Sequence, residues 1–310
     1  MALPRMALFD GRLQPYADSK LGLLTHALNY GTGVFAGIRG YWNQEQGQLF
    51  VFRLADHVRR LHESARLLRM NLTLSEEATA AALLDLLRAE GLREDCYLRV
   101  LAFYANEVIG VRLHGLQSVL AAVAIPFGLY IDKADGAHCT VSSWRRPDDN
   151  VVPPRGKITG SYINSALAKS DAELAGFDEA ILLNRDGYVS EGSGENIFLI
   201  RRGVAVTPSL DQSVLEGITR RSLMTLLREE LGLTVEERRI ERCELFLADE
   251  IFLTGTAAQI TAVTRIDHRP VGTGQMGDVT TRLRSLFFDV VRGRSPKYRS
   301  WCSPVQRAAT

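Results

Sequence analysis

The chain has 310 residues, 46% of them hydrophobic, and a formal net charge of +1. This length predicts about two domains with large buried cores, and the near-neutral charge argues against a nucleic-acid or membrane-surface role. The four cysteines form no C-x-x-C pair, so we expect reduced thiols instead of disulfides or a zinc site. No leader-like or spanning apolar segment is evident, and we expect a cytoplasmic protein with small neutral or zwitterionic substrates.

The first part of the chain predicts strands alternating with helices, because apolar residues recur at helical spacing in one stretch and form buried runs in others. We expect a strand closing at Phe52, helices at 54–68 and 75–90, and strands at 97–104 and 119–125. Proline, glycine and aspartate then interrupt the pattern. This interruption predicts a small N-terminal domain over residues 1–127 and an interdomain linker over 128–137.

The remaining residues, 138–310, predict a larger domain of mixed helices and strands. We expect strands at 139–144, 179–184, 188–191 and 196–200, and helices at 161–175, 217–231 and 279–291. Arg185-Asp186-Gly187 predicts a hairpin turn between two of these strands. A second turn, SEGSGEN at 190–196, is able to aim Glu191 into a cavity.

Two segments of this part carry groups that suit one cofactor. Lys157 lies in the glycine-flanked segment GKITGSY, which ends at Tyr162, and Glu191 lies in SEGSGEN. Pyridoxal phosphate (PLP) needs a lysine for an imine, a hydrogen bond to its ring oxygen and a carboxylate against its pyridine nitrogen. Only five of the 37 basic residues are lysines, which favours a special role for Lys157. An exposed lysine in a glycine-rich loop is the alternative.

A cofactor phosphate requires its own subsite, and the sequence offers two. Gly217, Ile218 and Thr219 open a predicted helix, where free backbone N–H groups attract anions. Thr256 and Ala257 belong to a similar segment after a predicted strand. Each segment alone is more often an ordinary helix start with an N-terminal cap.

Two other chemistries find no support in the motifs considered. The glycine-rich stretch from Gly31 to Gly37 lacks the G-x-G-x-x-G spacing and the chain has no H-E-x-x-H motif, so neither dinucleotide binding nor metal catalysis is predicted. We interpret the six histidines as structural, with His26 the one that could lie near the site.

The order of these motifs resembles the branched-chain amino-acid aminotransferases of the class IV (fold-type IV) PLP enzymes, from about Phe9 to beyond Phe288. Besides the Lys157 and Glu191 segments, the matching stretches are HALNYGTGVF at 26–35, RLHESA at 60–65, YLR at 97–99, VSSW at 141–144, GITR at 217–220 and ADEIFLTGTA at 248–257. The resemblance implies an α+β (mixed α/β) fold with a small N-terminal α/β domain, a larger pseudo-barrel domain and PLP at their interface.

The resemblance also implies site residues. Lys157 would be the catalytic lysine, with Glu191 on the pyridine nitrogen and Tyr162 on the ring oxygen. The implied phosphate residues are Arg60, Gly217, Ile218, Thr219 and Thr256. The implied substrate residues are Tyr97, Thr256 and Ala257 for the α-carboxylate, Phe35, Gly37, Tyr130 and Tyr162 for the side chain, and Tyr30 and Val111 from the partner subunit of a homodimer or larger homo-oligomer. Arg99 is our candidate for the γ-carboxylate of glutamate.

The predicted reaction is a ping-pong transfer of the amino group between Leu, Ile or Val and 2-oxoglutarate. Ala36, Val100 and Phe127 stand where the family usually has glutamate, proline and tryptophan, and they put the substrate range in doubt. A D-amino-acid or (R)-amine aminotransferase and an aminodeoxychorismate lyase are alternatives within the class. A noncatalytic PLP- or nucleotide-binding protein is the alternative outside it.

Overall fold

The computed structural model describes residues 3–128 and 136–306. The chain divides into two compact units: unit 1 comprises Met1–Gly128, Gly156–Gly160 and Asp289–Thr310, and unit 2 comprises Leu129–Arg155 and Ser161–Phe288. The segments 156–160 and 289–310 thus group with the N-terminal residues. The domain boundaries at 127 and 138 stay a prediction, and most of the predicted linker lies outside the described residues.

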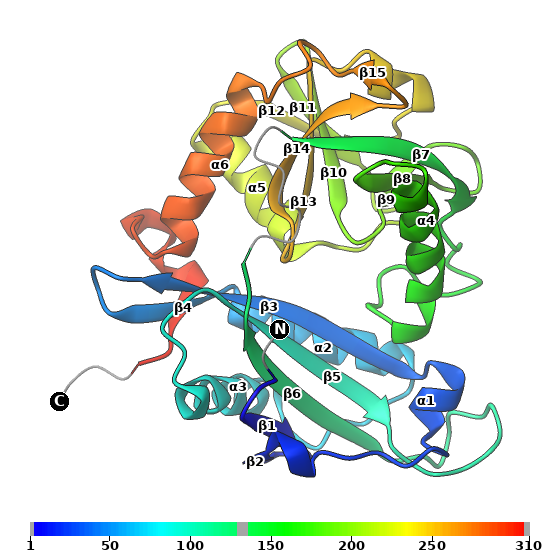
Figure 1. Cartoon of the computed structure of the whole chain (residues 1–310), viewed down its shortest axis with the longest axis vertical. Helices are drawn as coiled ribbons and strands as arrows, with labels where there is room; N and C mark the ends of the chain where they lie inside the picture. The colour runs from blue at the N-terminus through cyan, green and yellow to red at the C-terminus, as the bar shows by residue number, and fades with distance from the viewer. Residues whose placement is uncertain (1–2, 129–135, 307–310) are drawn as a thin grey trace. The chain divides into compact units, whose positions relative to one another are not determined.

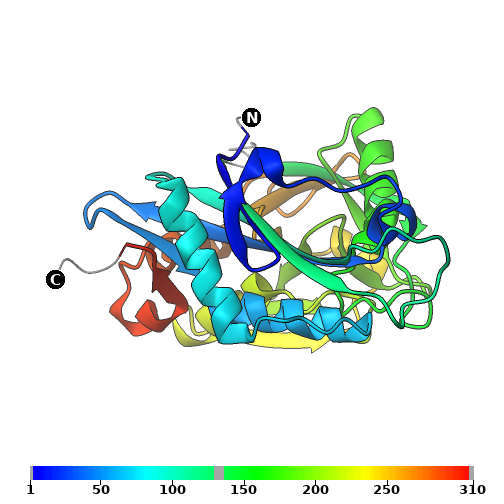
Figure 2. The same ribbon diagram turned by 90° about the horizontal axis from the view of Figure 1, so that it is seen from below.

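Unit 1 is built on a seven-stranded antiparallel sheet in the order β16-β4-β3-β5-β6-β1-β2. Helices α2 and α3 pack against this sheet and against each other (Figure 1 and Figure 2). The strands are β1 (Met6–Phe9), β2 (Arg12–Pro15), β3 (Gly33–Asn43), β4 (Gln48–Phe52), β5 (Cys96–Tyr104), β6 (Ser118–Pro126) and β16 (Cys302–Pro304). The helices are η1 (Tyr16–Asp18), α1 (His26–Tyr30), α2 (Leu54–Leu67), α3 (Glu76–Glu90) and η4 (Pro296–Trp301).

Local signals set the limits of α3, as predicted. Ser75 precedes the helix, and its side chain accepts a hydrogen bond from Ala78 N. Gly91 ends it in the left-handed conformation, with φ of 69°. The long strand β3 was not predicted, because Gly33, Gly37 and other glycines interrupt its apolar residues and glycine is uncommon inside strands.

Unit 2 contains a nine-stranded mixed sheet in the order β12-β11-β10-β13-β14-β7-β8-β9, with β15 paired to β14. The strands are β7 (Ala137–Arg145), β8 (Glu179–Leu183), β9 (Val189–Gly192), β10 (Asn196–Arg201), β11 (Val204–Pro208), β12 (Thr234–Arg238), β13 (Glu250–Gly255), β14 (Gln259–Ile266) and β15 (Arg269–Pro270). The helices are η2 (Thr159–Ser161), which begins in the unit 1 segment, α4 (Tyr162–Leu174), α5 (Ile218–Glu229), η3 (Arg242–Phe246) and α6 (Asp278–Val291), which runs on into the last segment of unit 1.

The unit 2 sheet curls, because its edge strand β9 also lies beside β10. Aliphatic side chains from β8, β10, β13 and β14 fill the interior of the curl, among them Ile181, Leu199 and Leu253. Helix α4 packs against β7 and β8, and α5 packs against β12 and β13 (Figure 1). This mixture of helices with a half-barrel sheet confirms the predicted fold class. Among the described residues, no helix combines the length and the apolar character needed to cross a bilayer.

Candidate active site

Lys157 lies in a short segment, residues 156–160, that pairs with the start of β3 within unit 1. Phe35 N donates to Lys157 O at 2.9 Å, and Lys157 N donates to Ser64 Oγ at 3.1 Å. Ser64 Oγ in turn donates to Arg60 O on α2 at 2.8 Å. The backbone of Lys157 is therefore fixed from both sides, by β3 and by α2. Sequence reasoning did not single out Ser64.

Two glycines allow this segment to lie close to β3. Gly31 has φ of 65°, and a Cβ atom there would lie 2.8 Å from Gly160 Cα. Thr159 Oγ1 bonds to the carbonyl oxygens of Gly31 and Gly33 at 2.8 and 3.0 Å. A side chain at residue 31 would strain the backbone and displace the segment that holds Lys157.

Four predicted substrate and pocket residues gather next to Lys157 in unit 1. Gly37 and Arg99 are directly opposite in the register of β3 and β5, so they share one face of the sheet with Phe35 and Tyr97. Arg99 Cζ lies 4.5 Å from the ring centroid of Phe35 and 5.4 Å from that of Tyr97. Lys157 Nζ lies 5.0 Å from the Phe35 centroid. The face thus combines aromatic walls with two cations.

The Tyr97 ring leaves no room for a side chain at Gly37, where an added Cβ atom would lie 2.0 Å from the tyrosine hydroxyl oxygen. Phe127 packs against Tyr97, with ring centroids 5.1 Å apart. Arg39 Cζ lies 5.3 Å from the Phe127 centroid, and Arg39 Nη2 donates to Phe127 O at 3.0 Å. Phe127 therefore belongs to the surroundings of a predicted substrate residue.

The other two departures from the family pattern lie elsewhere. Ala36 and Val100 are opposite each other in the β3–β5 register, and both are buried. Because side chains alternate along a strand, they point away from the face that carries Arg99. Phe127 is thus the departure whose side chain packs against a predicted substrate residue, Tyr97.

Glu191 lies at the end of β9 in unit 2 with a donor set around its buried carboxylate. Arg146 Nη2 is 2.8 Å from Glu191 Oε1. Asn196 Nδ2 and Leu215 N donate to Glu191 Oε2 at 3.0 and 3.1 Å. Sequence reasoning missed Arg146 and the role of Asn196. The signal available was the rule that a buried acid needs donors, but the sequence did not say which loops bring them.

The start of α5 also belongs to this arrangement in unit 2. Gly217 is the N-cap residue and provides no side-chain cap, so the first N–H groups of this 12-residue helix lack the side-chain partner that a Ser or Asp would give. A Cβ atom at Gly217 would lie 1.9 Å from Asn196 Oδ1, the amide group that also holds Glu191. Ile218 and Thr219 follow and are buried. This geometry is suited to an anionic group.

The remaining predicted residues occupy defined positions except one. Tyr162 begins α4, and Thr256 and Ala257 follow β13 half-buried in unit 2. Tyr30 ends α1 in unit 1, and its hydroxyl accepts from Gly110 N at 3.0 Å. Val111, the residue after Gly110 in that loop, is 79% exposed. Tyr130 lies outside the described residues.

His26 has a role in holding this loop. Its Nδ1 is 2.7 Å from Thr32 Oγ1 and its Nε2 is 2.7 Å from Gly110 O. Both ring nitrogens are thus engaged by neighbours in unit 1. The arrangement agrees with a structural role for this histidine.

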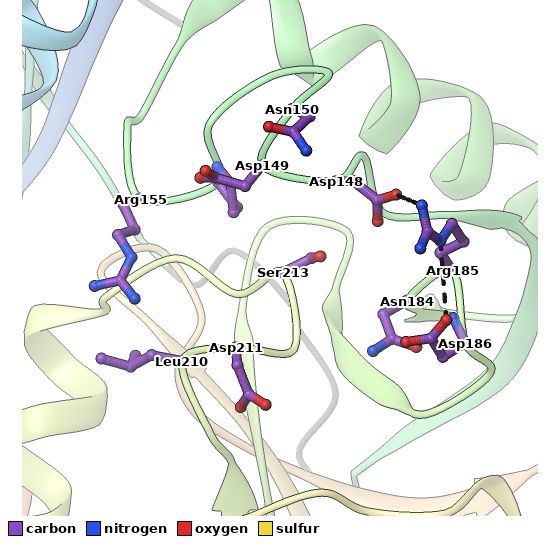
Figure 3. A pocket seen from close by; sticks show the side chains of 11 residues that line it. Asp148, Asp149, Asn150, Arg155, Asn184, Arg185, Asp186, Leu210, Asp211 and Ser213 are labelled. Carbon is purple, nitrogen blue, oxygen red and sulfur yellow. Dashed lines mark hydrogen bonds and ion pairs between the residues drawn. The ribbon is translucent and has the colours of Figure 1, made fainter.

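A polar cavity of about 400 Å³ lies among three loops of unit 2 (Figure 3). Arg185 pairs there with Asp148 at 3.1 Å and with Asp186 at 3.8 Å. Ser213, on another side, accepts from Ser190 Oγ through its carbonyl oxygen at 3.3 Å. None of the predicted site residues lines this cavity. Across the described chain, no group of three or more His, Cys, Asp or Glu side chains is placed to bind a metal.

Known proteins are similar to this chain in sequence and fold. The family described as amino-transferase class IV matches residues 33–266. A probable branched-chain-amino-acid aminotransferase of Aquifex aeolicus (strain VF5) is 46% identical over 299 residues, which are 96% of each chain.

Two solved structures extend the comparison. The branched-chain aminotransferase of Thermoproteus uzoniensis with norvaline has a TM-score of 0.94 and 42% identity, covering 98% of this chain and 100% of that one. The branched-chain amino acid aminotransferase of Thermobaculum terrenum in its PLP form has a TM-score of 0.94 and 38% identity, covering 98% of this chain and 99% of that one. With this family match over most of its length, the chain belongs to the class IV aminotransferases.

Proposed function

We propose that this protein is a PLP-dependent aminotransferase that moves the amino group between branched-chain L-amino acids and 2-oxoglutarate. The relatives with that name support the substrate class. The observation that carries the proposal is the unit 1 face on which Lys157, Phe35 and Arg99 meet, because it offers an amine, an aromatic wall and a carboxylate-binding cation together.

The residues present fit PLP in three respects. Lys157 supplies a primary amine on a backbone fixed by two hydrogen bonds. Glu191 supplies a buried carboxylate for the pyridine nitrogen, and Arg146 holds that carboxylate in an ion pair. The start of α5 supplies N–H groups for the phosphate. A dinucleotide site would not need this combination of amine and carboxylate.

When bound, PLP supplies an electron-withdrawing ring to which the substrate nitrogen becomes attached. The protein then has three tasks. Lys157 would move a proton to and from the substrate Cα as general base and acid. Glu191 would keep the pyridine nitrogen protonated. Tyr97, Thr256 and Ala257 would hold the α-carboxylate.

Dual substrate recognition is the task of the Phe35–Arg99 face. Aromatic side chains suit the aliphatic part of Leu, Ile or Val, and a guanidinium suits the γ-carboxylate of glutamate. Arg99 is exposed, its charge lies over the rings of Phe35 and Tyr97, and it has no acidic partner among the described residues. Its N–H groups are therefore able to pair with a substrate carboxylate.

Arg99→Leu is expected to lower kcat/KM for glutamate and 2-oxoglutarate and to leave kcat/KM for leucine unchanged. A charge-assisted hydrogen bond of roughly 1.5 to 3 kcal/mol corresponds to a ~10- to 150-fold loss in kcat/KM, and exposure of the guanidinium favours the lower part of that range. Single-turnover rates with each donor measure the difference. Arg93→Leu, another exposed arginine of unit 1, is the control. Equal losses for leucine and glutamate would show that Arg99 only stabilises its strand.

A donor panel with 2-oxoglutarate as acceptor tests the reaction against the other enzymes of the class. We expect turnover with L-leucine, L-isoleucine and L-valine, and none with their D-enantiomers or with simple (R)-amines. Turnover of D-amino acids alone would assign the protein to the D-amino-acid aminotransferases. We also propose that the protein works in the cytoplasm, where these metabolites are found.

We further propose a homodimer or larger homo-oligomer, in which Tyr30 and Val111 contribute to the partner's substrate pocket. Apolar side chains are exposed on residues 21–28, which lead into α1, and on the loop around Gly110, and His26 joins these two segments. The exposed residues are Leu21, Leu23, Leu24, Leu28, Val108, Ile109 and Val111. Exposed apolar side chains on two joined segments are typical of an interaction surface.

Sedimentation at assay concentration is expected to show no monomer. Leu23→Asp, which places a charge on a side chain that is 85% exposed, is expected to produce inactive monomer, because the charge would have to be buried in the interface. Leu247→Asp, on an exposed apolar residue of unit 2, is the control. A monomer with full activity would exclude the partner's role in the pocket.

A further inference from the structure

Three titratable side chains lie close together in unit 2, beside the turn that carries Glu191; two are buried carboxyl groups and the third is the half-buried Lys169. Lys169 Nζ on α4 lies 3.0 Å from Glu179 Oε2 at the start of β8. Glu179 is 0% exposed and Glu195 is 4% exposed. Glu195 interacts electrostatically with both of the others. The two buried carboxyl groups thus lie near one ammonium group, which also pairs with the exposed Glu173 at 3.4 Å.

An unpaired charge in such a region is costly, and a buried carboxyl group avoids the cost by keeping its proton. Glu179 has the direct contact with Lys169, and its Oε1 also accepts from Ala180 N at 2.7 Å. Glu195 Oε2 accepts only from Gly194 N, at 3.1 Å, among the described residues. Glu179 is therefore the member with the ammonium partner, and Glu195 is the member that remains neutral.

The Glu195 side chain folds back against its own turn. A Cβ atom added at Gly192 would lie 2.7 Å from Glu195 Oε2, and Gly192 N donates to Glu195 O at 2.7 Å. The next residue, Asn196, donates to Glu191 Oε2 at 3.0 Å. The side chain of Glu195 thus fills the turn between Glu191 and the amide group that holds it.

We propose that Glu195 is an uncharged carboxylic acid that serves as a positioning residue, holding the 190–196 turn and through Asn196 the carboxylate of Glu191. Its consequence for transamination rests on the function proposed above for Glu191. Ionisation of Glu195 would place a negative charge beside Glu179 and near Glu191, and it would loosen the turn by repulsion.

The groups around Glu195 come from three strands, a helix and the turn itself, and they agree with this assignment. Burial, followed by the charge of Glu179, raises the pKa of Glu195 to about 8, with a smaller rise from Glu191. The N–H of Gly194 and the charge of Lys169 act in the opposite direction. Cys139 on β7 is the remaining titratable neighbour, and burial keeps its pKa well above the usual range, so it stays a neutral thiol.

The protonation of Glu195 predicts the direction in which the stability of the protein changes with pH. Because the folded pKa of Glu195 lies above that of an unfolded carboxyl group, its stabilising effect is complete below the unfolded pKa and is lost as pH rises through about 8. Over this window the folding equilibrium constant of the apoprotein should fall by up to about tenfold per pH unit through this one group. Lys169 keeps its charge over this pH range. Burial lowers its pKa, but the charge and hydrogen bond of Glu179 raise the pKa by more than burial lowers it.

The experiment is a series of denaturant unfolding curves of the apoprotein between pH 5 and 9. Glu195→Gln, which cannot ionise, is expected to lose the decline in stability seen in the unmodified protein. Glu179→Gln is expected to lose it as well, because Glu195 then has the charge of Lys169 nearby without the repulsion of Glu179 and needs no proton. Glu63→Gln, an exposed carboxyl group of unit 1, is the control and should keep the decline.

A decline that persists in both Glu195→Gln and Glu179→Gln would overturn the assignment, and the second variant decides if the first does not fold. The positioning role has its own readout, the ratio of the PLP dissociation constants at pH 9 and pH 6.5. We expect this ratio to be several-fold larger in the unmodified protein than in Glu195→Gln, and equal ratios would refute the positioning role. Neither measurement requires turnover, so a failure of the proposed transamination would be seen separately.

Discussion

Lys157→Ala is expected to abolish transamination and to remove the visible absorbance that the PLP-loaded protein should show, while the protein still folds. The reason is chemical: alanine offers neither an amine for the cofactor aldehyde nor a base for the substrate Cα proton. The backbone contacts of residue 157 with Phe35 and Ser64 do not involve the side chain and should survive. Absorbance spectra, circular dichroism and the half-reaction with L-leucine measure the three effects.

Lys20→Ala, which removes an exposed lysine of unit 1, is the matched control and should retain activity. Borohydride reduction of the PLP-loaded protein, followed by peptide mapping, identifies the lysine that holds the cofactor. We expect the label on Lys157 alone. Label on Lys169 or Lys297 instead would reject the assignment.

Glu191→Gln is expected to retain PLP and to slow turnover by at least ~10²-fold, a loss of about 2.7 kcal/mol of transition-state stabilisation. Glutamine keeps the shape of the side chain but cannot hold the charge of a protonated pyridine nitrogen. It would also leave the Arg146 guanidinium, 2.8 Å from the carboxylate, without its charge partner. Pre-steady-state rates with L-leucine measure the loss in the chemical step.

Arg146→Met provides an independent check on this interpretation. It leaves the Glu191 carboxylate in place with its bonds from Asn196 and Leu215 but removes the ion pair. We expect a smaller loss in kcat than in Glu191→Gln, with a change in the absorbance spectrum of bound PLP. A Glu191→Gln enzyme with near-normal kcat would transfer the role to another carboxyl group, and Glu195 would be the first to test.

The sequence predicted the elements that depend on local signals and missed those that depend on tertiary contacts. The helices at 54–68 and 75–90 were predicted because an apolar stripe or a cap marks them, and both are present as α2 and α3. Strand β3 was missed because its glycines resemble a turn, although Gly37 is required by the neighbouring Tyr97 ring. Its role in holding Lys157 became visible only with the pairing of 156–160.

The residues of the candidate site likewise fall into those with a local sequence signal and those without one. Lys157 and Glu191 could be selected from residue type and glycine-rich surroundings, and their catalytic roles remain predictions. Arg146, Asn196 and Ser64 could not be selected, because a donor is recognised only by the acceptor beside it, and these partners lie five to 93 residues apart in the chain. The buried pair of Glu179 and Glu195 likewise needs three dimensions, since nothing in SEGSGEN shows that one carboxyl group lacks a cation.

The most direct test of the central claim is the half-reaction of the PLP-loaded protein with L-leucine, followed by visible absorbance in a stopped-flow instrument. The account predicts that L-leucine removes the visible band in a single turnover, that 4-methyl-2-oxopentanoate is released in equal amount, and that 2-oxoglutarate restores the band. D-leucine should leave the spectrum of the loaded protein in place. A band that L-leucine does not change, or one that only D-leucine removes, would contradict the assignment of this chain as a branched-chain L-amino-acid aminotransferase.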